Sequence, residues 1–251
     1  MLNKTIRAIA GLGLAVVLGV ATWPGGVAVA GGCPIDLPQG GEPVTLDPAD
    51  FTGPIDNPYW PMTPGTTWKF RETDKGVELS VRVYVTTRTK EIIGIQATVV
   101  HDVVREGRHV IENTWDWYAQ DACGNVWYLG ENTKEYENGA VVSTAGSWEA
   151  GVDGAQPGVV IPADPAVGVS YRQEFFAGEA EDHAEILSVS EQAEVPFGHF
   201  TDVLLTKDDT PLHPKVLEYK LYARGVGPVL VFGVSGGSGT EELISFELGA
   251  A

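Results

Sequence analysis

The densest cluster of side chains that could carry chemistry in this 251-residue sequence lies at residues 179–185, Glu-Ala-Glu-Asp-His-Ala-Glu. If the segment forms a β-strand, alternation places Glu181, His183 and Glu185 on one face. On a concave face these groups could bind a metal or act as acid and base, as in a hydrolase. If the segment is helical instead, Glu179 and His183 lie one turn apart and could pair or chelate a metal. Because runs of charge usually lie in solvent, we predict a solvated segment and assign no catalytic residue.

Other motifs do not complete a catalytic or metal site. The five histidines form no His-Glu-x-x-His zinc helix, and the two cysteines form no Cys-x-x-Cys site. A Gly-x-Ser-x-Gly match occurs at residues 233–237, but poor helix formers follow Ser235 and the last histidine, His213, lies upstream. A hydrolase nucleophile elbow needs a following helix and a later histidine, so we predict a glycine-rich hairpin loop. The sequence therefore predicts no cofactor.

Aromatic side chains are concentrated at residues 115–131, Trp-Asp-Trp-Tyr-Ala-Gln-Asp-Ala-Cys-Gly-Asn-Val-Trp-Tyr-Leu-Gly-Glu. Gly and Asn at positions 124 and 125 tolerate positive φ, so two aromatic strands can meet there in a turn. Alternation puts Trp115 and Trp117 on one face and Asp116 and Tyr118 on the other. Such a hairpin can form either the core of a β-domain or the wall of a binding surface.

Three functions remain open, and the leading interpretation is a non-catalytic binding module. In it, a concave aromatic face holds a small apolar or amphipathic ligand beneath a proline-rich lid. The candidate ligand-binding residues are Tyr59, Trp60, Trp115, Trp117, Trp127 and Tyr128. The alternatives are a hydrolase-type enzyme that uses Glu181, His183 and Glu185, and a glycan- or cell-wall-binding surface with exposed Trp127 and Trp148.

The first 30 residues have the pattern of a signal peptide. Lys4 and Arg7 precede an apolar run at residues 8–22, and Ala28-Val29-Ala30 provides small residues before a cleavage site. The apolar run is shorter than the ~20 residues of a membrane-spanning helix. We therefore predict a secreted or periplasmic protein without a transmembrane span.

Cys33 has two mutually exclusive fates after export. In an oxidising compartment Cys33 and Cys123 most simply form one disulfide. Residues 30–33, Ala-Gly-Gly-Cys, also resemble a lipoprotein box, which would attach a lipid anchor to Cys33 instead. We predict the Cys33–Cys123 disulfide, with lipidation as the alternative.

The balance of charge restricts the class of partner. Sixteen basic and 34 acidic residues give a formal net charge of −18. A nucleic acid or an anionic membrane is disfavoured as a partner, because its phosphate groups would be repelled. The oligomeric state is left open by the sequence.

The chain after the signal peptide divides into an extended arm and a series of strands. Residues 31–64 are rich in Pro and Gly and predict an arm or lid. Residues 65–251 predict a single β-domain, because β-prone runs alternate with turn residues. The predicted strands are 66–73, 77–89, 91–104, 108–120, 126–136, 140–144, 169–176, 184–195, 199–206, 216–223, 229–234 and 241–248. Residues 146–168 predict a long loop, and the one segment that could form a helix is 179–187.

We therefore predict an all-β fold in which long antiparallel strands form a curved half-barrel or open barrel. The sequence also resembles a family of uncharacterised exported bacterial β-rich proteins over most of residues 55–232. The resemblance rests on four segments, Asn57-Pro58-Tyr59-Trp60-Pro61, residues 116–128 (Asp-Trp-Tyr…Gly-Asn-Val-Trp-Tyr), Tyr171-Arg172-Gln173-Glu174 and residues 222–229 (Tyr-Ala-Arg-Gly-Val-Gly-Pro-Val). It implies no activity and no catalytic residues.

Overall fold

The computed structural model describes residues 37–237 and 239–250. Within these residues the protein is all-β, apart from one 3₁₀ turn at Pro48–Asp50. The strands are β1 (Thr67–Asp74), β2 (Val77–Ile92), β3 (Ile95–Glu106), β4 (His109–Gln120), β5 (Val126–Glu137), β6 (Ala140–Ser143), β7 (Trp148–Glu149), β8 (Gln156–Ile161), β9 (Ser170–Arg172), β10 (Glu174–Phe175), β11 (His183–Val195), β12 (Gly198–Asp209), β13 (Leu217–Ala223), β14 (Gly227–Ser235) and β15 (Thr240–Glu247). The predicted all-β class is confirmed.

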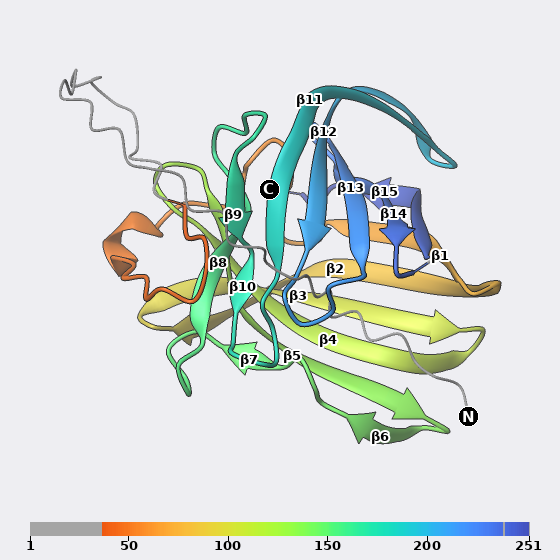
Figure 1. The fold of residues 1–251 in the computed structure, drawn as a ribbon, viewed down its shortest axis with the longest axis horizontal. Helices are drawn as coiled ribbons and strands as arrows, with labels where there is room; N and C mark the ends of the chain where they lie inside the picture. The colour runs from red at the N-terminus through yellow and green to blue at the C-terminus, as the bar shows by residue number, and fades with distance from the viewer. Residues whose placement is uncertain (1–36, 238, 251) are drawn as a thin grey trace.

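One antiparallel sheet contains these strands and curves into an open half-barrel (Figure 1). The order across the sheet is β10-β8-β5-β4-β3-β2-β1-β15-β14-β13-β12-β11-β9, with β6 and β7 paired to β5. In Figure 1, β2–β6 form the lower half of the sheet and β11–β15 the upper half. The pairing of β1 with β15 joins the two halves.

Alternation of side chains explains how the long strands bury one face. In β2, Val81 and Val85 are buried, whereas Arg82 between them is exposed. The hairpin between β5 and β6 turns at Asn138 (φ 52°) and Gly139 (φ 80°). These left-handed conformations are those that an Asn-Gly turn requires, so the predicted hairpin is confirmed.

One prediction about local structure is wrong, and one alternative is not realised. Residues 146–168 are not a long loop, because they contain β7 and β8, which both pair with β5. The strand β8 was not predicted because it contains a proline and a glycine, which are typical of loops. Its residues Val159 and Ile161 are completely buried. Residues 179–187 contain no helix either, since the segment enters the sheet at His183 as β11.

The chain passes directly from one edge strand, β9, to the other, β10, at a seam where no ladder joins the two edges of the described sheet. These strands occupy opposite ends of the strand order, yet only Gln173 separates them in sequence. The buried guanidinium of Arg172 donates to the carbonyl of Pro157 in β8 at 2.7 Å. A Cβ atom added to Gly158 would lie 2.3 Å from the carbonyl carbon of Gln173, so the close contact at this seam requires glycine.

The proline-rich segment before β1 packs against both the seam and the core. Arg172 donates further hydrogen bonds to the carbonyls of Gly40 and Glu42. Farther along the segment, Tyr59 and Met62 are buried in the core. The segment is drawn in orange and lies beside β8 at the left of Figure 1.

Some of the sequence predictions concern residues 1–36. The signal peptide and Cys33, with its disulfide or lipid anchor, lie outside the described residues and stay predictions. In the part of the chain that the structure describes, no helix has the length and apolar character needed to cross a membrane.

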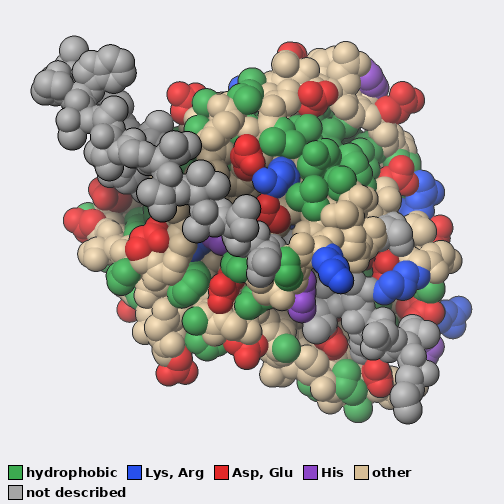
Figure 2. All heavy atoms as spheres, in the orientation of Figure 1, with side chains coloured by type: hydrophobic (Ala, Val, Ile, Leu, Met, Phe, Trp, Pro, Cys, Tyr) green, Lys and Arg blue, Asp and Glu red, His purple; other side chains and the backbone are tan. Residues whose placement is uncertain are grey.

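Acidic residues outnumber basic residues in the chain by 34 to 16. Figure 2 shows Asp and Glu side chains scattered across the face in view, with fewer Lys and Arg among them. The more localised concentration of acidic groups lies inside the curve of the sheet.

Candidate functional site

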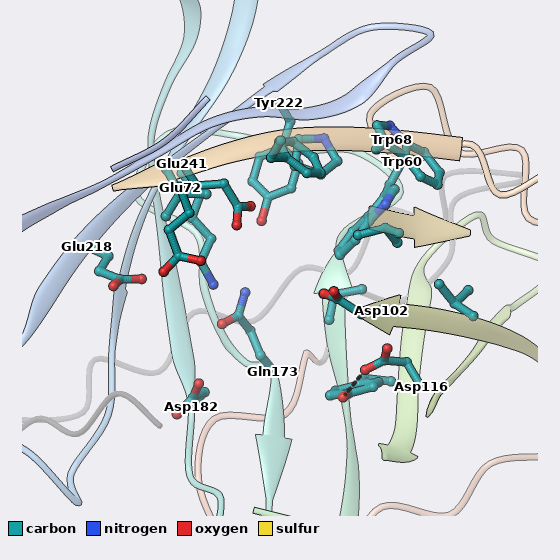
Figure 3. A pocket seen from close by; sticks show the side chains of 18 of the residues that line it. Trp60, Trp68, Glu72, Asp102, Asp116, Gln173, Asp182, Glu218, Tyr222 and Glu241 are labelled. Carbon is teal, nitrogen blue, oxygen red and sulfur yellow. Dashed lines mark hydrogen bonds between the residues drawn. The ribbon is translucent and has the colours of Figure 1, made fainter. Parts of the chain in front are cut away.

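A cavity of about 360 Å³ lies between the arm and the concave side of the sheet. Its wall is formed by the arm, by strands β1–β5 from one half of the sheet, and by β13–β15 from the other. Residues at the seam complete it. Figure 3 shows side chains from these separate elements pointing toward a common space.

Aromatic rings connect the two halves of the cavity wall. The ring of Trp60, from the arm, lies 5.5 Å from the ring of Tyr118 in β4 and 5.9 Å from that of Tyr222 in β13. Tyr118 in turn stacks on Tyr128 of β5, with centroids 4.7 Å apart and ring planes inclined by 15°. The arm therefore provides the ring that bridges the lower and upper strands.

Carboxyl groups enter the inner part of the cavity from several elements. They are Asp102, Asp116, Glu131, Glu174 and Asp182. The hydroxyl of Tyr128 donates to Asp116 Oδ1 at 2.7 Å, and the indole N–H of Trp148 donates to Glu174 Oε2 at 2.8 Å. These donors offset part of the cost of holding carboxyl groups away from bulk water.

Burial makes several of these carboxyl groups retain protons. It raises the pKa of Glu174 to about 7. Burial also raises the pKa of Glu131 well above its usual value, with further contributions from the charges of Asp116 and Glu174. The pKa of Asp182 is raised by burial and then by the charge of Glu174. The charge inside the cavity therefore changes with pH near neutrality.

A second group of carboxyl side chains lies toward the ends of β1, β13 and β15. It consists of Glu72, Asp74, Glu218 and Glu241. Glu72 and Glu241 lie opposite each other in the β1–β15 register. Figure 3 places Glu72, Glu218 and Glu241 on the side away from Trp60 and Trp68. The exposed residue Gly237 also lines the cavity, which therefore reaches the surface at the glycine-rich loop between β14 and β15.

Lys220 is the single basic residue among the described residues that line the cavity. Its Nζ atom lies 2.9 Å from Oδ2 of the buried Asp208. Burial alone would lower the pKa of Lys220, but the carboxylate of Asp208 and other neighbouring groups outweigh it and raise the pKa above its usual value. Lys220 is thus paired within the protein, and acidic residues outnumber basic residues in the lining.

Gln173 places a polar group in the cavity at the seam of the sheet. The residue is only 6% exposed, and Figure 3 shows its side-chain amide pointing into the cavity. Its backbone N–H donates to the carbonyl of Asp182 at 2.7 Å, but no described residue hydrogen-bonds to its side-chain amide. The amide is therefore positioned to hydrogen-bond a ligand or an ordered water molecule.

The six aromatic residues that the sequence predicts as ligand-binding do not all meet at this site. Trp60 and Tyr128 line the cavity. Trp115 and Trp117 project from the opposite face of β4, where the guanidinium of Arg88 lies 4.8 Å from the Trp115 ring and Lys90 Nζ lies 3.3 Å from the Trp117 ring.

The other predicted aromatic residues are part of the scaffold. The indole N–H of Trp127 donates to Asp121 Oδ2 at 2.8 Å and fixes the turn between β4 and β5. Tyr59 is buried, with the guanidinium of Arg224 4.4 Å from its ring. Trp148, which the glycan-binding alternative requires to be exposed, is 4% exposed, and Trp127 is also buried.

The predicted acid–base cluster is likewise separate from the cavity, and Glu181, His183 and Glu185 are not among the lining residues. Glu185 forms an ion pair with Lys207 at 2.9 Å, and Glu181 Oε1 accepts a hydrogen bond from the backbone N–H of Gly178. The intervening Asp182, which the sequence reasoning did not select, does line the cavity.

Sequence reasoning also missed the inward-facing carboxyl groups on the long strands. A usable signal existed, since Asp102 follows Val100 by two positions and Asp116 precedes Tyr118 by two. An acid that shares the apolar face of a strand is expensive to bury without a purpose. Among the described residues, no group of three or more His, Cys, Asp or Glu side chains is arranged to hold a metal ion.

Comparison with known proteins leaves the function to be argued from the cavity. No protein family and no curated protein sequence matches this chain. Among solved structures, the chain is similar to a protein described as a "putative lipoprotein" from Parabacteroides distasonis, with a TM-score of 0.42 and 13% sequence identity. That match covers 75% of this chain and 98% of the other. The resemblance to an exported bacterial family stays a prediction.

Proposed function

We propose that this protein is a non-catalytic module that binds a small amphipathic ligand in the cavity between the arm and the curved sheet. The cavity volume of about 360 Å³ lies in the range of small-molecule sites. Such sites typically combine an apolar, aromatic lining with polar groups that orient the ligand. The lining here combines aromatic and aliphatic side chains with Gln173, Lys220 and a larger number of carboxyl groups.

The observation that carries the proposal is the side-chain amide of Gln173. It is buried, points into the cavity and has no hydrogen-bond partner among the described residues. Elsewhere in the lining, Trp60, Tyr118 and Tyr222 offer apolar surface. A ligand with one polar and one apolar end would satisfy both.

Binding of 1-aminoanthracene, a fluorescent probe that is uncharged at neutral pH, tests this proposal. We expect its emission to increase and shift to shorter wavelength with the wild-type chain. Val100→Phe, which places a larger side chain in the cavity, should weaken binding roughly tenfold or more, equivalent to about 1.4 kcal/mol. Val141→Phe is the matched control, because Val141 lies on β6 and is 49% exposed.

The two valine variants separate binding in the cavity from binding at the surface. Circular dichroism and urea denaturation would first establish that both variants are folded. Equal affinity of wild type and Val100→Phe, or no change in probe emission with any of the chains, would contradict the proposal.

A further inference from the structure

We infer that the outer face of strands β1–β5, which is turned away from the cavity, binds an extended acidic segment of a partner polypeptide. This surface lies on the opposite side of the strands from the proposed ligand site. Its basic side chains are aligned across the sheet, lack acidic partners within the described part of the chain and stand on a convex surface.

The strand register aligns basic side chains on this face. Cavity-lining residues alternate along β1–β5 with residues that point outward. In the outward set, Lys69 of β1 lies opposite Arg82 of β2, which lies opposite Val103 of β3. The same row continues through Asn113 of β4 to Lys134 of β5. Neighbouring strands are about 4.8 Å apart, so the row spans roughly 19 Å.

Two further arginines flank this row. Arg105 of β3 is the diagonal neighbour of Arg82 on the same face. Arg88 of β2 lies over the outward ring of Trp115, 4.8 Å from its centroid, and Arg82 lies over Tyr84 at 4.9 Å. A guanidinium that rests on a ring still presents N–H donors along its edge in the fork geometry that matches a carboxylate.

The basic groups of this face are not neutralised by the acids of the chain. Acidic residues outnumber basic ones by 34 to 16, so partners are available in excess. Lys69 and Arg82 even lie opposite each other in the ladder, an arrangement of like charges that usually destabilises a sheet. In the described part of the chain, no ion pair and no side-chain hydrogen bond involves Lys69, Arg82, Arg88, Arg105 or Lys134.

Two acidic residues near this face are engaged by other bases. Glu242 pairs with Arg71 at 2.7 Å, and Glu149 pairs with Lys90 at 2.6 Å. Both ion pairs leave the five unpaired basic groups as they are.

His101, which also points outward, responds to the positive potential of this face. Burial lowers the pKa of His101, and the charges of Arg82, Arg105 and Arg88 lower it further, although the hydrogen bond to Asn113 opposes them. Three arginines therefore act on one imidazole from two strands. The same potential would attract carboxylate groups from outside.

The length of the row, the net charge and the curvature of the sheet select the kind of partner. A row of roughly 19 Å matches about six residues of an extended chain, whereas a small anion would reach only neighbouring groups. The formal net charge of −18 disfavours a nucleic acid, whose phosphates continue beyond the basic row. A flat membrane would contact only part of the convex face (Figure 1). A short acidic peptide segment can stay within the row.

Fluorescence anisotropy of a labelled hexaglutamate peptide tests the inference, with hexaglutamine carrying the same label as the uncharged reference. With the full chain at about 20 mM salt, we expect the acidic peptide to bind and its affinity to fall as salt is added. Combining Lys69→Gln with Arg82→Gln should weaken binding about fivefold, because two ion pairs are lost. Combining Lys75→Gln with Lys215→Gln makes the same change of charge at exposed positions away from the row and should leave binding unchanged.

Urea denaturation of the first double variant separates binding from folding. This variant should be at least as stable as wild type, because it removes two like charges that lie opposite each other. A clear loss of stability would mean that the two charges serve the fold, and would overturn the inference. So would equal affinity of wild type and this variant for hexaglutamate, equal binding of hexaglutamine, or no binding of either peptide. Tighter binding of hexathymidylate than of hexaglutamate would assign the face to a nucleic acid and would also overturn it.

Discussion

The aromatic side chains on the two faces of strand β4 have charged neighbours of opposite sign. On the outer face, His101 stacks on Trp115 with centroids 3.9 Å apart, Arg88 lies over the same ring, and Lys90 lies over Trp117. On the inner face, Tyr118 stacks on Tyr128 and the neighbouring charged group is Asp116.

The two faces differ in whether the aromatic rings have cationic partners within the protein. Outer rings are combined with cations from β2, so the attraction between ring and cation is satisfied within the sheet. Inner rings are combined with carboxyl groups and with the unpartnered amide of Gln173. The outer rings therefore have their charged partners within the sheet, whereas the inner rings line the cavity together with acidic groups and the amide of Gln173.

The largest expected effect comes from opening the seam that encloses the inner face. Gly158→Ala would place a Cβ atom 2.3 Å from the carbonyl carbon and oxygen of Gln173, so β8 and residue 173 must separate. We expect a loss of about 3 kcal/mol or more in the free energy of unfolding, measured by urea denaturation, because both contacting groups are backbone.

The control for the seam is Gly198→Ala at the start of β12. A Cβ atom there would meet nothing within 4 Å, so this substitution should cost little. A similar, small loss for both variants would show that the seam does not depend on the close contact at Gly158.

A smaller effect concerns the buried carboxyl groups of the inner face. The pKa of Glu174 is raised by burial to about 7, compared with an ordinary value of 4.5. Between these pH values the folded chain binds more protons than the unfolded chain, so the free energy of unfolding falls as pH rises. Removing this group should make Glu174→Gln more stable than wild type above pH 7, by up to about 3 kcal/mol, with a flatter dependence on pH.

Urea denaturation at pH 4.5, 6 and 8 measures this effect. Wild type and Glu174→Gln should differ least at pH 4.5 and most at pH 8. Glu185→Gln, outside the cavity, should follow the wild-type curve. A difference between wild type and Glu174→Gln that is constant over this range would refute the assignment.

Much of the fold could be predicted because it depends on local signals. Period-two alternation and turn residues located the long strands, and Asn138-Gly139 located a hairpin. The strand β8 could not be recognised in this way. In the sequence, Gly158 has the character of a loop residue. In the folded sheet, glycine is needed at this position because the backbone of Gln173 packs against it and leaves no room for a Cβ atom.

The site was less predictable because it depends on which face of each strand becomes concave. Alternation separated Trp115 and Trp117 from Asp116 and Tyr118, but it could not say which pair faces inward. A prediction that selects tryptophans as ligand-binding residues chooses Trp115 and Trp117, which lie on the outer face. The curvature of the sheet brings Glu72, Asp182 and Lys220 into one cavity from strands and loops far apart in sequence. No local sequence pattern predicts that these residues lie close together.

The smallest expected effect concerns the outer face, and it has the opposite sign. Burial lowers the pKa of His101, and the nearby charges of Arg82, Arg105 and Arg88 lower it further, although the hydrogen bond to Asn113 at 2.8 Å opposes them. Below the ordinary pKa of about 6.5, the unfolded chain therefore binds more protons at this site than the folded chain, so stability falls as pH decreases.

His101→Gln, which keeps a hydrogen-bonding side chain but cannot titrate, should remove this dependence on acid. We expect wild type to lose more stability than the variant between pH 7.5 and 5, measured by urea denaturation at both values. His199→Gln, at an exposed position on β12, is the matched control and should behave as wild type. Parallel curves for wild type and His101→Gln would mean that the arginine-rich outer face does not disfavour imidazolium, and the contrast between the two faces would then rest on the inner carboxyl groups alone.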